Sequence, residues 1–196
     1  MAEKIKQSEL KKKQIVEAAL ELFFEKGYEG TSIRMIQNKV ESPVGLFYYY
    51  FESKDAVFEE TIKLFFESYE KEMQNVINSS KNKPDEVLTK YINYMDYATQ
   101  DFRSKYLAKL HWTILSAIRE YTLRVMKKYI LLILENYVEN GVIKIPKENI
   151  TVTANLIAFG TGGSILYQSK EVYESQKDDI LIRYQKCWVQ INFRRE

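Results

Sequence analysis

The stretch TSIRMIQNKVESPVGLFYYYFESK, residues 31–54, decides the fold. Thr31 and Ser32 at its start are suited to the N-terminal cap of a short helix. Pro43 is suited to the first position of another helix, where its missing N–H costs nothing. Two short helices joined by a tight turn are the layout of a helix-turn-helix. The sequence places them at Ser32–Lys39 and Pro43–Tyr50.

A longer helix is expected on the N-terminal side of this stretch. Apolar residues recur at helical spacing from Ile15 to Phe23, and Gly27 stands where a glycine commonly ends a helix. A lysine-rich arm precedes it, which either follows DNA phosphates or is a solvated tail. The arm carries Lys4, Lys6, Lys11, Lys12 and Lys13.

The rest of the chain has apolar patterns that predict longer helices. Asn78–Pro84 is a linker, the apolar run 114–138 predicts a central helix, and Asn140–Gly141 stops it. Val142–Pro146 is expected to be an extended loop. We predict an all-α chain of about nine helices, including a short one over 106–112 and two closing ones at Lys147–Gln168 and Val172–Phe193. A three-helix N-terminal domain spans residues 1–52, and a helical bundle spans residues 53–196.

Composition narrows the functional classes. Of 196 residues, 45% are hydrophobic and 29% charged, and with 7 Gly and 3 Pro the chain has too few turn residues for a β-sandwich. The single Cys187 and single His111 exclude an internal disulfide and a Cys/His zinc site. No nucleophile or acid is fixed near His111 by spacing, so we expect no enzyme and no cofactor. Without a signal peptide or a membrane span, we expect a cytoplasmic protein.

Several side chains of the helix-turn-helix suit a DNA surface. Thr31 and Ser32 stand at a helix N-terminus, which favours a phosphate, and Arg34 lies in the first turn. Lys54 begins the next helix. A cation at a helix N-terminus is unfavourable unless a phosphate lies between the lysine and the helix end. Phenolic hydroxyls also lie on the second short helix, at Tyr48 and Tyr49, while Phe47 and Phe51 are expected in the core.

These residues resemble a known family. The segment Ile15…Ala18-Ala19…Leu22-Phe23…Gly27-Tyr28…Thr31-Ser32-Ile33…Ile36, then Gly45…Tyr48-Tyr49-Tyr50-Phe51…Lys54…Phe58, resembles the TetR/AcrR family of bacterial transcriptional regulators. The resemblance covers residues 10–60. It implies a DNA-binding domain on a ligand-binding and dimerisation domain. Such proteins usually repress from a double-stranded palindromic operator and are released by a small molecule.

The resemblance also assigns roles within the motif. Thr31, Ser32 and Lys54 match phosphate-contacting positions, and Arg34 matches a position that reaches a base or a phosphate. Tyr48 and Tyr49 match positions that contact phosphate or thymine methyl groups. The recognition helix, where base edges are read, opens with Pro43, Val44, Gly45 and Leu46.

The chain also departs from the family pattern. Where the family usually has Gly-Val-Ser, this chain has Glu41-Ser42-Pro43, so the turn lacks the glycine that tolerates positive φ. Val44 stands where many members carry Lys or Arg. Residues 1–55 hold nine basic and nine acidic residues, which gives no net charge. We therefore predict few base contacts and substantial readout of DNA shape.

Candidate effector-binding residues are aromatic and methionine side chains of the second domain. Acidic residues are interspersed among them, at Glu67, Asp96 and Glu120. An aromatic cavity with one buried carboxylate would suit a lipophilic cation, while the alternative is that the acids are solvated and the aromatic residues only form the core. The candidates are Tyr91, Tyr94, Met95, His111, Trp112 and Met126.

The last two helices carry apolar faces that suit a homodimer, although each helix also needs one face for the monomer core. A phosphate-loop function of Gly160–Gly163 is disfavoured, because no Lys-Ser/Thr follows, and close helix approach explains these glycines better. The candidate interface residues are Gly160, Gly163, Tyr167, Tyr184, Cys187, Trp188 and Ile191. Two other classes stay open: a helical small-molecule-binding adaptor whose DNA-binding domain has lapsed, and a helical enzyme acting through His111.

Overall fold

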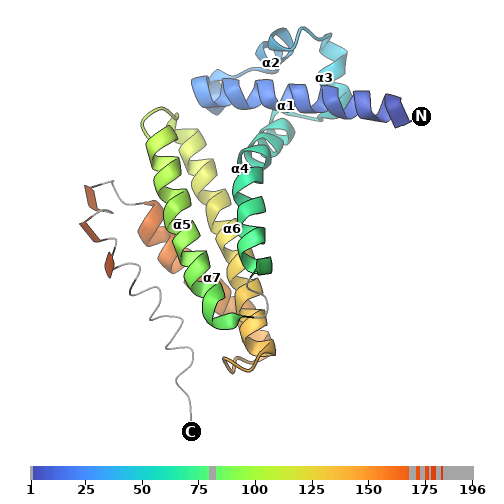
Figure 1. The fold of residues 1–196 in the computed structure, drawn as a ribbon. Helices are drawn as coiled ribbons and strands as arrows, with labels where there is room; N and C mark the ends of the chain where they lie inside the picture. Colours follow the sequence, from blue (N-terminus) through green and yellow to red (C-terminus); the bar gives the residue numbers. More distant parts are fainter. Residues whose placement is uncertain are drawn as a thin grey trace. The chain divides into compact units, whose positions relative to one another are not determined.

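A computed structural model describes residues 2–79, 83–167, 171–172, 175–176, 178–179 and 182. Every regular element in these residues is an α-helix (Figure 1), as the sequence predicts. The segment Val142–Pro146 forms no strand and connects two helices as an extended loop. The helices are α1 (Ala2–Gly30), α2 (Ile33–Lys39), α3 (Val44–Tyr50), α4 (Lys54–Ser79), α5 (Pro84–Tyr106), α6 (Trp112–Glu139) and α7 (Lys147–Leu166).

The predicted count of nine helices is not matched by these seven. The expected short helix over 106–112 is wrong, because α5 continues to Tyr106 and the chain then turns, with the N–H groups of Lys109 and Leu110 donating to the Tyr106 carbonyl. The predicted closing helix Val172–Phe193 lies largely outside the described residues.

The chain divides into two compact units. One comprises Met1–Tyr69 with Gln100–Ile118, and the other comprises Glu70–Thr99 with Arg119–Glu196. Helices α4, α5 and α6 therefore each contribute residues to both. This division follows packing rather than function, so the predicted domain boundary after residue 52 stays a prediction.

The first unit is built on α1, with α2 and α3 on one side of it (Figure 1). Ile15, Ala19 and Phe23 of α1 are fully buried, and Ile36 of α2 and Phe47 of α3 are equally buried. Burial of these apolar side chains supplies the main force that holds the three helices together. It fixes the direction of α3, which has too few residues to be stable alone.

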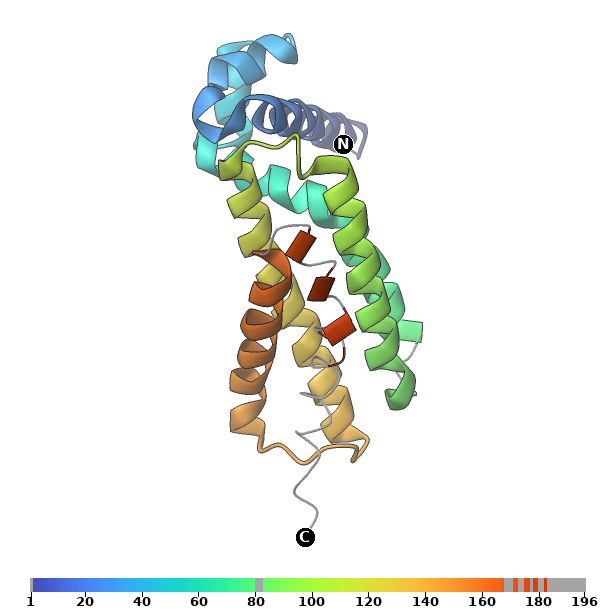
Figure 2. The ribbon, with the colours of Figure 1, turned by 90° about the vertical axis from the view of Figure 1, so that its left-hand side faces the viewer.

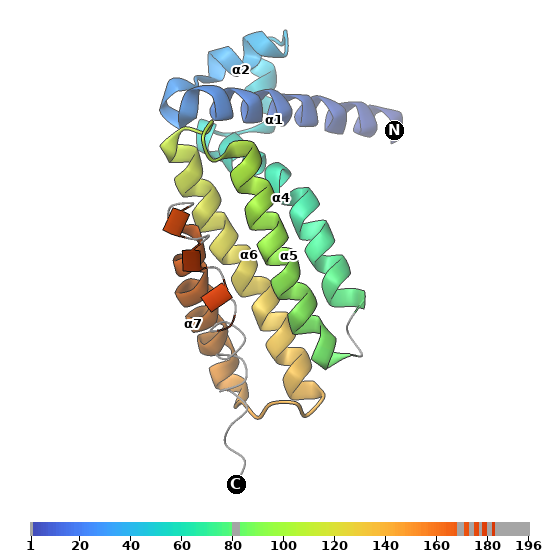
Figure 3. The same cartoon turned by 60° about the vertical axis from the view of Figure 1, so that its left-hand side comes forward.

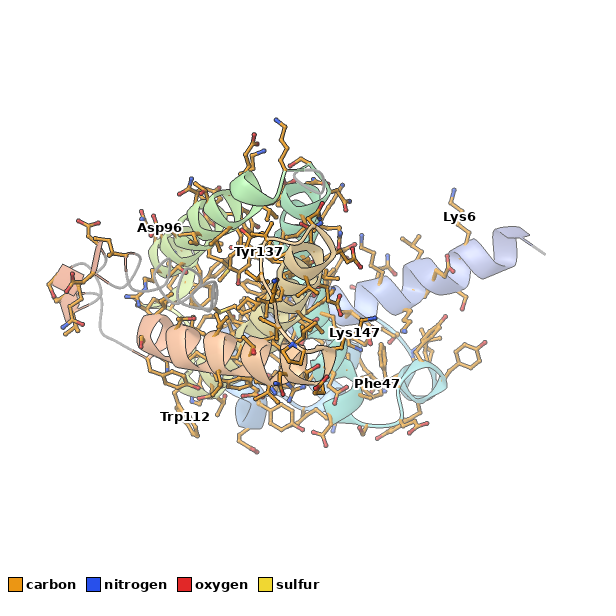
Figure 4. All side chains as sticks on the ribbon, turned by 90° about the horizontal axis from the view of Figure 1, so that it is seen from below. Lys6, Phe47, Asp96, Trp112, Tyr137 and Lys147 are labelled. Atoms are coloured by element: carbon orange, nitrogen blue, oxygen red, sulfur yellow. The ribbon has the colours of Figure 1, made fainter. Side chains whose placement is uncertain are left out.

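The second unit is a bundle in which α5, α6 and α7 lie side by side (Figures 2 and 3). The predicted central helix is confirmed, because Ile130, Ile133 and Leu134 of α6 are completely buried. Tyr137 on the same helix points into the bundle (Figure 4) and is 6% exposed. No helix in the described residues is long and apolar enough to cross a membrane.

Candidate nucleic-acid interface

Helix α2 begins as the sequence predicts. The Ser32 side chain accepts a hydrogen bond from the Met35 backbone N–H at 3.2 Å, which satisfies one free donor at the helix start. Ser32 and Arg34 are both exposed, so both face solvent at the start of this helix.

Thr31 is placed differently from its neighbour. It is only 1% exposed, and its hydroxyl lies 3.0 Å from the Leu22 carbonyl oxygen and 2.9 Å from that of Gly27. The hydroxyl therefore ties the start of α2 to the end of α1. The phosphate contact expected of Thr31 stays a prediction, and this buried hydroxyl does not supply it in the conformation described.

The turn between α2 and α3 contains the strained residue that the sequence indicates. Glu41 has φ of +50°, the left-handed region in which glycine is favoured. The backbone around it is nevertheless bonded, since the N–H of Ser42 donates to the Gln37 carbonyl at 3.1 Å. The missing glycine of the family pattern is thus accepted at some cost in backbone energy.

Replacing Glu41 by glycine is expected to raise the free energy of unfolding by about 0.5–1 kcal/mol, because relief of the left-handed strain exceeds the added chain entropy. Guanidinium unfolding followed by circular dichroism measures the change. The matched control is Glu52→Gly, an exposed glutamate whose φ is not positive, which should lose stability instead. Equal losses in both variants would show that the turn is unstrained.

Helix α3 presents a distinct outer face. Phe47 is fully buried, whereas Tyr48 and Tyr49 are 57% and 74% exposed. Gly45 lies one turn earlier on the same face, and it is exposed as well. We call Gly45, Tyr48 and Tyr49 the outer face of α3; a major groove admits an α-helix, and this is the face such a contact would use.

Neighbouring rings hold this face in place. Tyr48 packs edge-on against Phe47 at 5.5 Å between centroids, and Tyr49 packs edge-on against Tyr50 at 4.8 Å. The Tyr50 hydroxyl lies 3.1 Å from the Ser8 hydroxyl of α1. No periodic pattern in the sequence predicts this link between Tyr50 and α1. The two exposed phenols are therefore largely oriented before any partner binds.

The remaining candidates of the recognition helix are less prominent. Pro43 is exposed and precedes α3 directly, and Leu46 is half-buried. The backbone of Val44 begins the helix, and its side chain lies outside the described atoms.

Groups of the protein itself bind the charge of Lys54, which is unfavourable at the N-terminus of α4. Its ammonium donates to the carbonyl oxygens of Tyr28 at 2.9 Å and Thr31 at 3.0 Å, and it lies 4.0 Å from the centre of the Tyr28 ring. The Tyr28 carbonyl lies in the last turn of α1 and the Thr31 carbonyl just after it, at a helix C-terminus where a cation is favoured. Lys54 therefore fastens α4 to the segment that leads into α2.

Tyr28 and Asp55 add a second contact between the end of α1 and the start of α4. Neither residue was predicted to belong to this site. The Tyr28 hydroxyl donates to the Asp55 carboxylate. Burial, followed by the hydrogen bond and the charge of Asp55, raises the pKa of Tyr28 to about 12. The phenol thus stays protonated, and remains a donor, throughout the neutral range.

Replacing Lys54 by methionine keeps the aliphatic length and removes the ammonium. We expect a loss of about 1–2 kcal/mol in the free energy of unfolding, because two charge-assisted hydrogen bonds disappear from a partly exposed site. If the third N–H also binds a phosphate, as predicted, the slope of log K against log salt for DNA binding will fall by about 1.8 per dimer. An unchanged slope would contradict the phosphate contact and leave Lys54 a positioning residue alone.

Residues 15–61 match the family model described as bacterial regulatory proteins, tetR family. The matched range covers α2, α3, their turn and the hydrogen bonds from Lys54 to Tyr28 and Thr31. Over these residues, the chain is similar to the TetR family.

A curated relative is similar over about half of the chain. The biofilm operon icaADBC HTH-type negative transcriptional regulator IcaR of Staphylococcus aureus is 28% identical over 96 residues, which are 49% of this chain and 50% of IcaR. The chain thus spans about half the length of the curated relatives it matches.

Solved structures of other proteins show the same fold. A TetR-family transcriptional regulator from Pectobacterium atrosepticum aligns with a TM-score of 0.56 at 12% identity, over 97% of this chain and 98% of its own. The reduced form of NemR from Escherichia coli gives 0.51 at 15% identity, over 90% and 96%. At these identities the likeness concerns the fold alone.

The predicted effector residues of the chain fall into two groups. Tyr91 and Met126 are buried in the core of the second unit, with Tyr94 and Met95 packed against that core. His111 and Trp112 belong to the first unit instead and are exposed. Trp112 is 69% exposed, and its side chain projects from the ribbon in Figure 4. The structure thus does not gather the six residues in one core.

His111 has a structural position that the sequence did not indicate. A Cβ added at Gly27 would lie 2.6 Å from its Nδ1, so the imidazole rests directly on this glycine. The same Nδ1 lies 2.9 Å from the Thr113 hydroxyl. His111 therefore packs the turn before α6 against the end of α1.

The predicted dimer residues are described only in part. On α7, Gly160 is exposed and Gly163 half-exposed, and a Cβ on either would meet nothing within 4 Å. Of the glycines in Gly160–Gly163, Gly162 makes the expected close helix approach, since a Cβ there would lie 2.5 Å from Leu123 Cδ2. Tyr167 is 60% exposed. Outside the described residues lie Tyr184, Cys187, Trp188 and Ile191.

Within the part of the chain described, no group of three or more His, Cys, Asp or Glu side chains is arranged to hold a metal ion.

Proposed function

We propose that this chain is a DNA-binding transcriptional regulator, a repressor that binds a palindromic operator as a homodimer and is released by a small-molecule effector. The observation that carries the proposal is the outer face of α3, whose two exposed tyrosines stand on the buried Phe47 within a TetR-family domain. Exposed aromatic side chains on a fixed short helix have no role in the core of the domain. IcaR is described as a negative transcriptional regulator, which supports repression rather than activation.

The homodimer is supported by α7. Its exposed side is unusually apolar, with Val152 at 55%, Leu156 at 72% and Phe159 at 46% exposure. Large exposed apolar patches mark association surfaces. A dimer also explains recognition, because one short helix reads too few base pairs, whereas two reach successive major grooves about 34–36 Å apart.

Release requires an effector that binds two states of the protein with different affinity, since equal affinity shifts no equilibrium. The buried aromatic and methionine residues of the second unit, Tyr91 and Met126 among them, are the lining we propose for it. A wider separation of the two α3 helices in the effector-bound dimer would then no longer match both half-sites. Such a regulator would act in the cytoplasm, as a binding protein rather than an enzyme.

The proposal is tested by fluorescence anisotropy at fixed salt. Purified full chain is titrated onto DNA from upstream of its own gene and onto a scrambled duplex of equal length. We expect saturation at two protomers per site and affinity at least ~10³-fold above that for the scrambled duplex. Tyr48→Ala should abolish this preference, whereas Tyr97→Ala, an exposed tyrosine of α5, should keep it.

Equal, weak binding of both duplexes would contradict the proposal. It would favour the adaptor with a lapsed DNA-binding domain, and thermal-shift screening of small molecules would then be the next measurement.

A further inference from the structure

The break in α1 at Gly27 is followed by a short segment, residues 28–32, that leads into α2. Gly27 itself has φ of 74° and ψ of 172°, which is not a helical conformation. Beyond the break, the Tyr28 carbonyl accepts hydrogen bonds from the Thr31 N–H at 3.3 Å and from the Lys54 ammonium at 2.9 Å. Because α2 begins two residues after Thr31, the position of Tyr28 governs where α2 starts.

The start of α6 holds the same tyrosine by its N–H group. The backbone N–H of Tyr28 donates to the hydroxyl oxygen of Thr113, with 3.4 Å between the nitrogen and the oxygen. These two residues are 85 positions apart in the chain but belong to the same compact unit. The N–H and the carbonyl of Tyr28 are thus both bonded, the first to α6 and the second to Lys54 of α4.

His111 orients the Thr113 hydroxyl. Its Nδ1 accepts the backbone N–H of Thr113 at 3.4 Å and lies 2.9 Å from the hydroxyl oxygen of the same residue. A ring nitrogen that accepts one hydrogen bond has a lone pair and no proton, so the hydroxyl donates to it as well. The hydroxyl oxygen then keeps its lone pairs for the Tyr28 N–H. The imidazole itself rests on Gly27, which fixes this arrangement at the break in α1.

This contact bears on DNA binding through α2. The helix has only seven residues, so its direction depends on the groups that hold its two ends. Ser32 and Arg34, both exposed at its start, are the side chains expected to contact phosphates. Hydrogen bonds weaken steeply when their geometry is poor, so a small displacement of Tyr28 would weaken these contacts without removing either side chain.

We propose that Thr113, oriented by His111, is a positioning residue of the DNA-binding site. It holds Tyr28, and with it the start of α2, in the conformation that binds the operator. The inference rests on the proposed DNA-binding function and adds a residue far outside the 15–61 segment that matches the family model. The sequence assigns Thr113 no role and makes His111 a candidate effector-binding residue instead.

The test compares Thr113→Val, which keeps the shape and removes the hydroxyl, with Thr113→Ser, which keeps the hydroxyl. The wild-type full chain first selects its binding site from random duplex DNA. For that duplex we expect Thr113→Val to bind roughly tenfold more weakly, because each of the two protomers loses one hydrogen bond. Thr113→Ser should bind as the wild type does. Thr89→Val, at an exposed threonine of α5, is the matched control and should also bind normally.

Two further readouts distinguish positioning from a general loss of structure. Binding of a scrambled duplex, and the slope of log K against log salt, should stay unchanged in Thr113→Val because no cation is removed. Amide hydrogen exchange followed by NMR should show faster exchange of the Tyr28 N–H in Thr113→Val than in the wild type or Thr113→Ser. The amides of α7 should keep their rates in all three proteins.

The outcomes separate this inference from the proposed function. Wild-type affinity for the selected duplex in Thr113→Val, an equal loss in Thr113→Ser, an equal loss for the scrambled duplex, or an unchanged exchange rate at Tyr28 would each overturn the positioning role and leave the regulator intact. Failure of the wild type to enrich any sequence would overturn the proposed function, and this inference with it.

Discussion

Replacing Phe47 by alanine is expected to lower the free energy of unfolding by about 3–5 kcal/mol, the usual cost of emptying a fully buried aromatic site. Phe47 is completely buried, and its ring packs against Phe51 at 5.6 Å as well as against Tyr48. With α3 no longer anchored, DNA binding should be lost together with stability. Guanidinium unfolding and DNA anisotropy on the same sample measure the two effects.

The adjacent residue is the control. Tyr48 is 57% exposed, so Tyr48→Ala should change stability by about 0.5 kcal/mol or less while it removes specific DNA binding. Neighbouring positions on one helix would thus separate folding from recognition. A Phe47→Ala variant with wild-type stability would refute the packing described for this domain.

The second large effect is expected at Gly27. Its φ of 74° and ψ of 172° lie in a region that is essentially restricted to glycine. An added Cβ would also lie 2.6 Å from Nδ1 and 2.7 Å from Cγ of His111. Gly27→Ala should therefore lower the free energy of unfolding by about 3 kcal/mol, since backbone strain and the steric conflict add.

A double-mutant cycle separates these two causes. His111→Ala removes the ring that the new Cβ would meet, so it should recover about 1 kcal/mol of the loss in Gly27→Ala and leave the backbone strain. No recovery would show that the close approach to His111 is unimportant. A loss of less than 1 kcal/mol in Gly27→Ala itself would show that α1 does not need to break at this residue.

Much of the first domain was predictable because its signals are local. The cap at Ser32, the stop at Gly27 and the burial of Phe47 and Phe51 each depend on a few neighbouring residues, and the structure confirms them. The positive φ at Glu41 was indicated by comparison with the glycine usual at that position.

Long-range contacts were not predictable in this way. The bonds from Lys54 to the carbonyls of Tyr28 and Thr31 join residues 26 and 23 positions apart, and no spacing rule encodes them. The side chain of Thr31 was expected outside, yet its hydroxyl is bonded to α1. The sequence makes His111 a candidate effector-binding residue, whereas its packing partner is Gly27, where α1 breaks.

The buried and exposed sides of helix α7 were also not predictable from the sequence. Its sequence is apolar nearly all round, so periodicity alone does not separate the side that packs inward from the side left for a partner. The structure makes the division, with Ala154, Ala158 and Gly162 inward and Leu156 and Phe159 outward. The glycines of this helix also differ in role, which a run of small residues does not reveal.

The central claim is that the outer face of α3 contacts DNA, and photo-cross-linking tests it most directly. The full chain is bound to the duplex from upstream of its own gene, with 5-iododeoxyuridine in place of thymine, irradiated and digested with trypsin. Because Lys39 and Lys54 bound the segment, one peptide, residues 40–54, contains α3. We predict that the DNA is attached to this peptide at Tyr48 or Tyr49. Attachment only to peptides elsewhere in the chain would contradict the account.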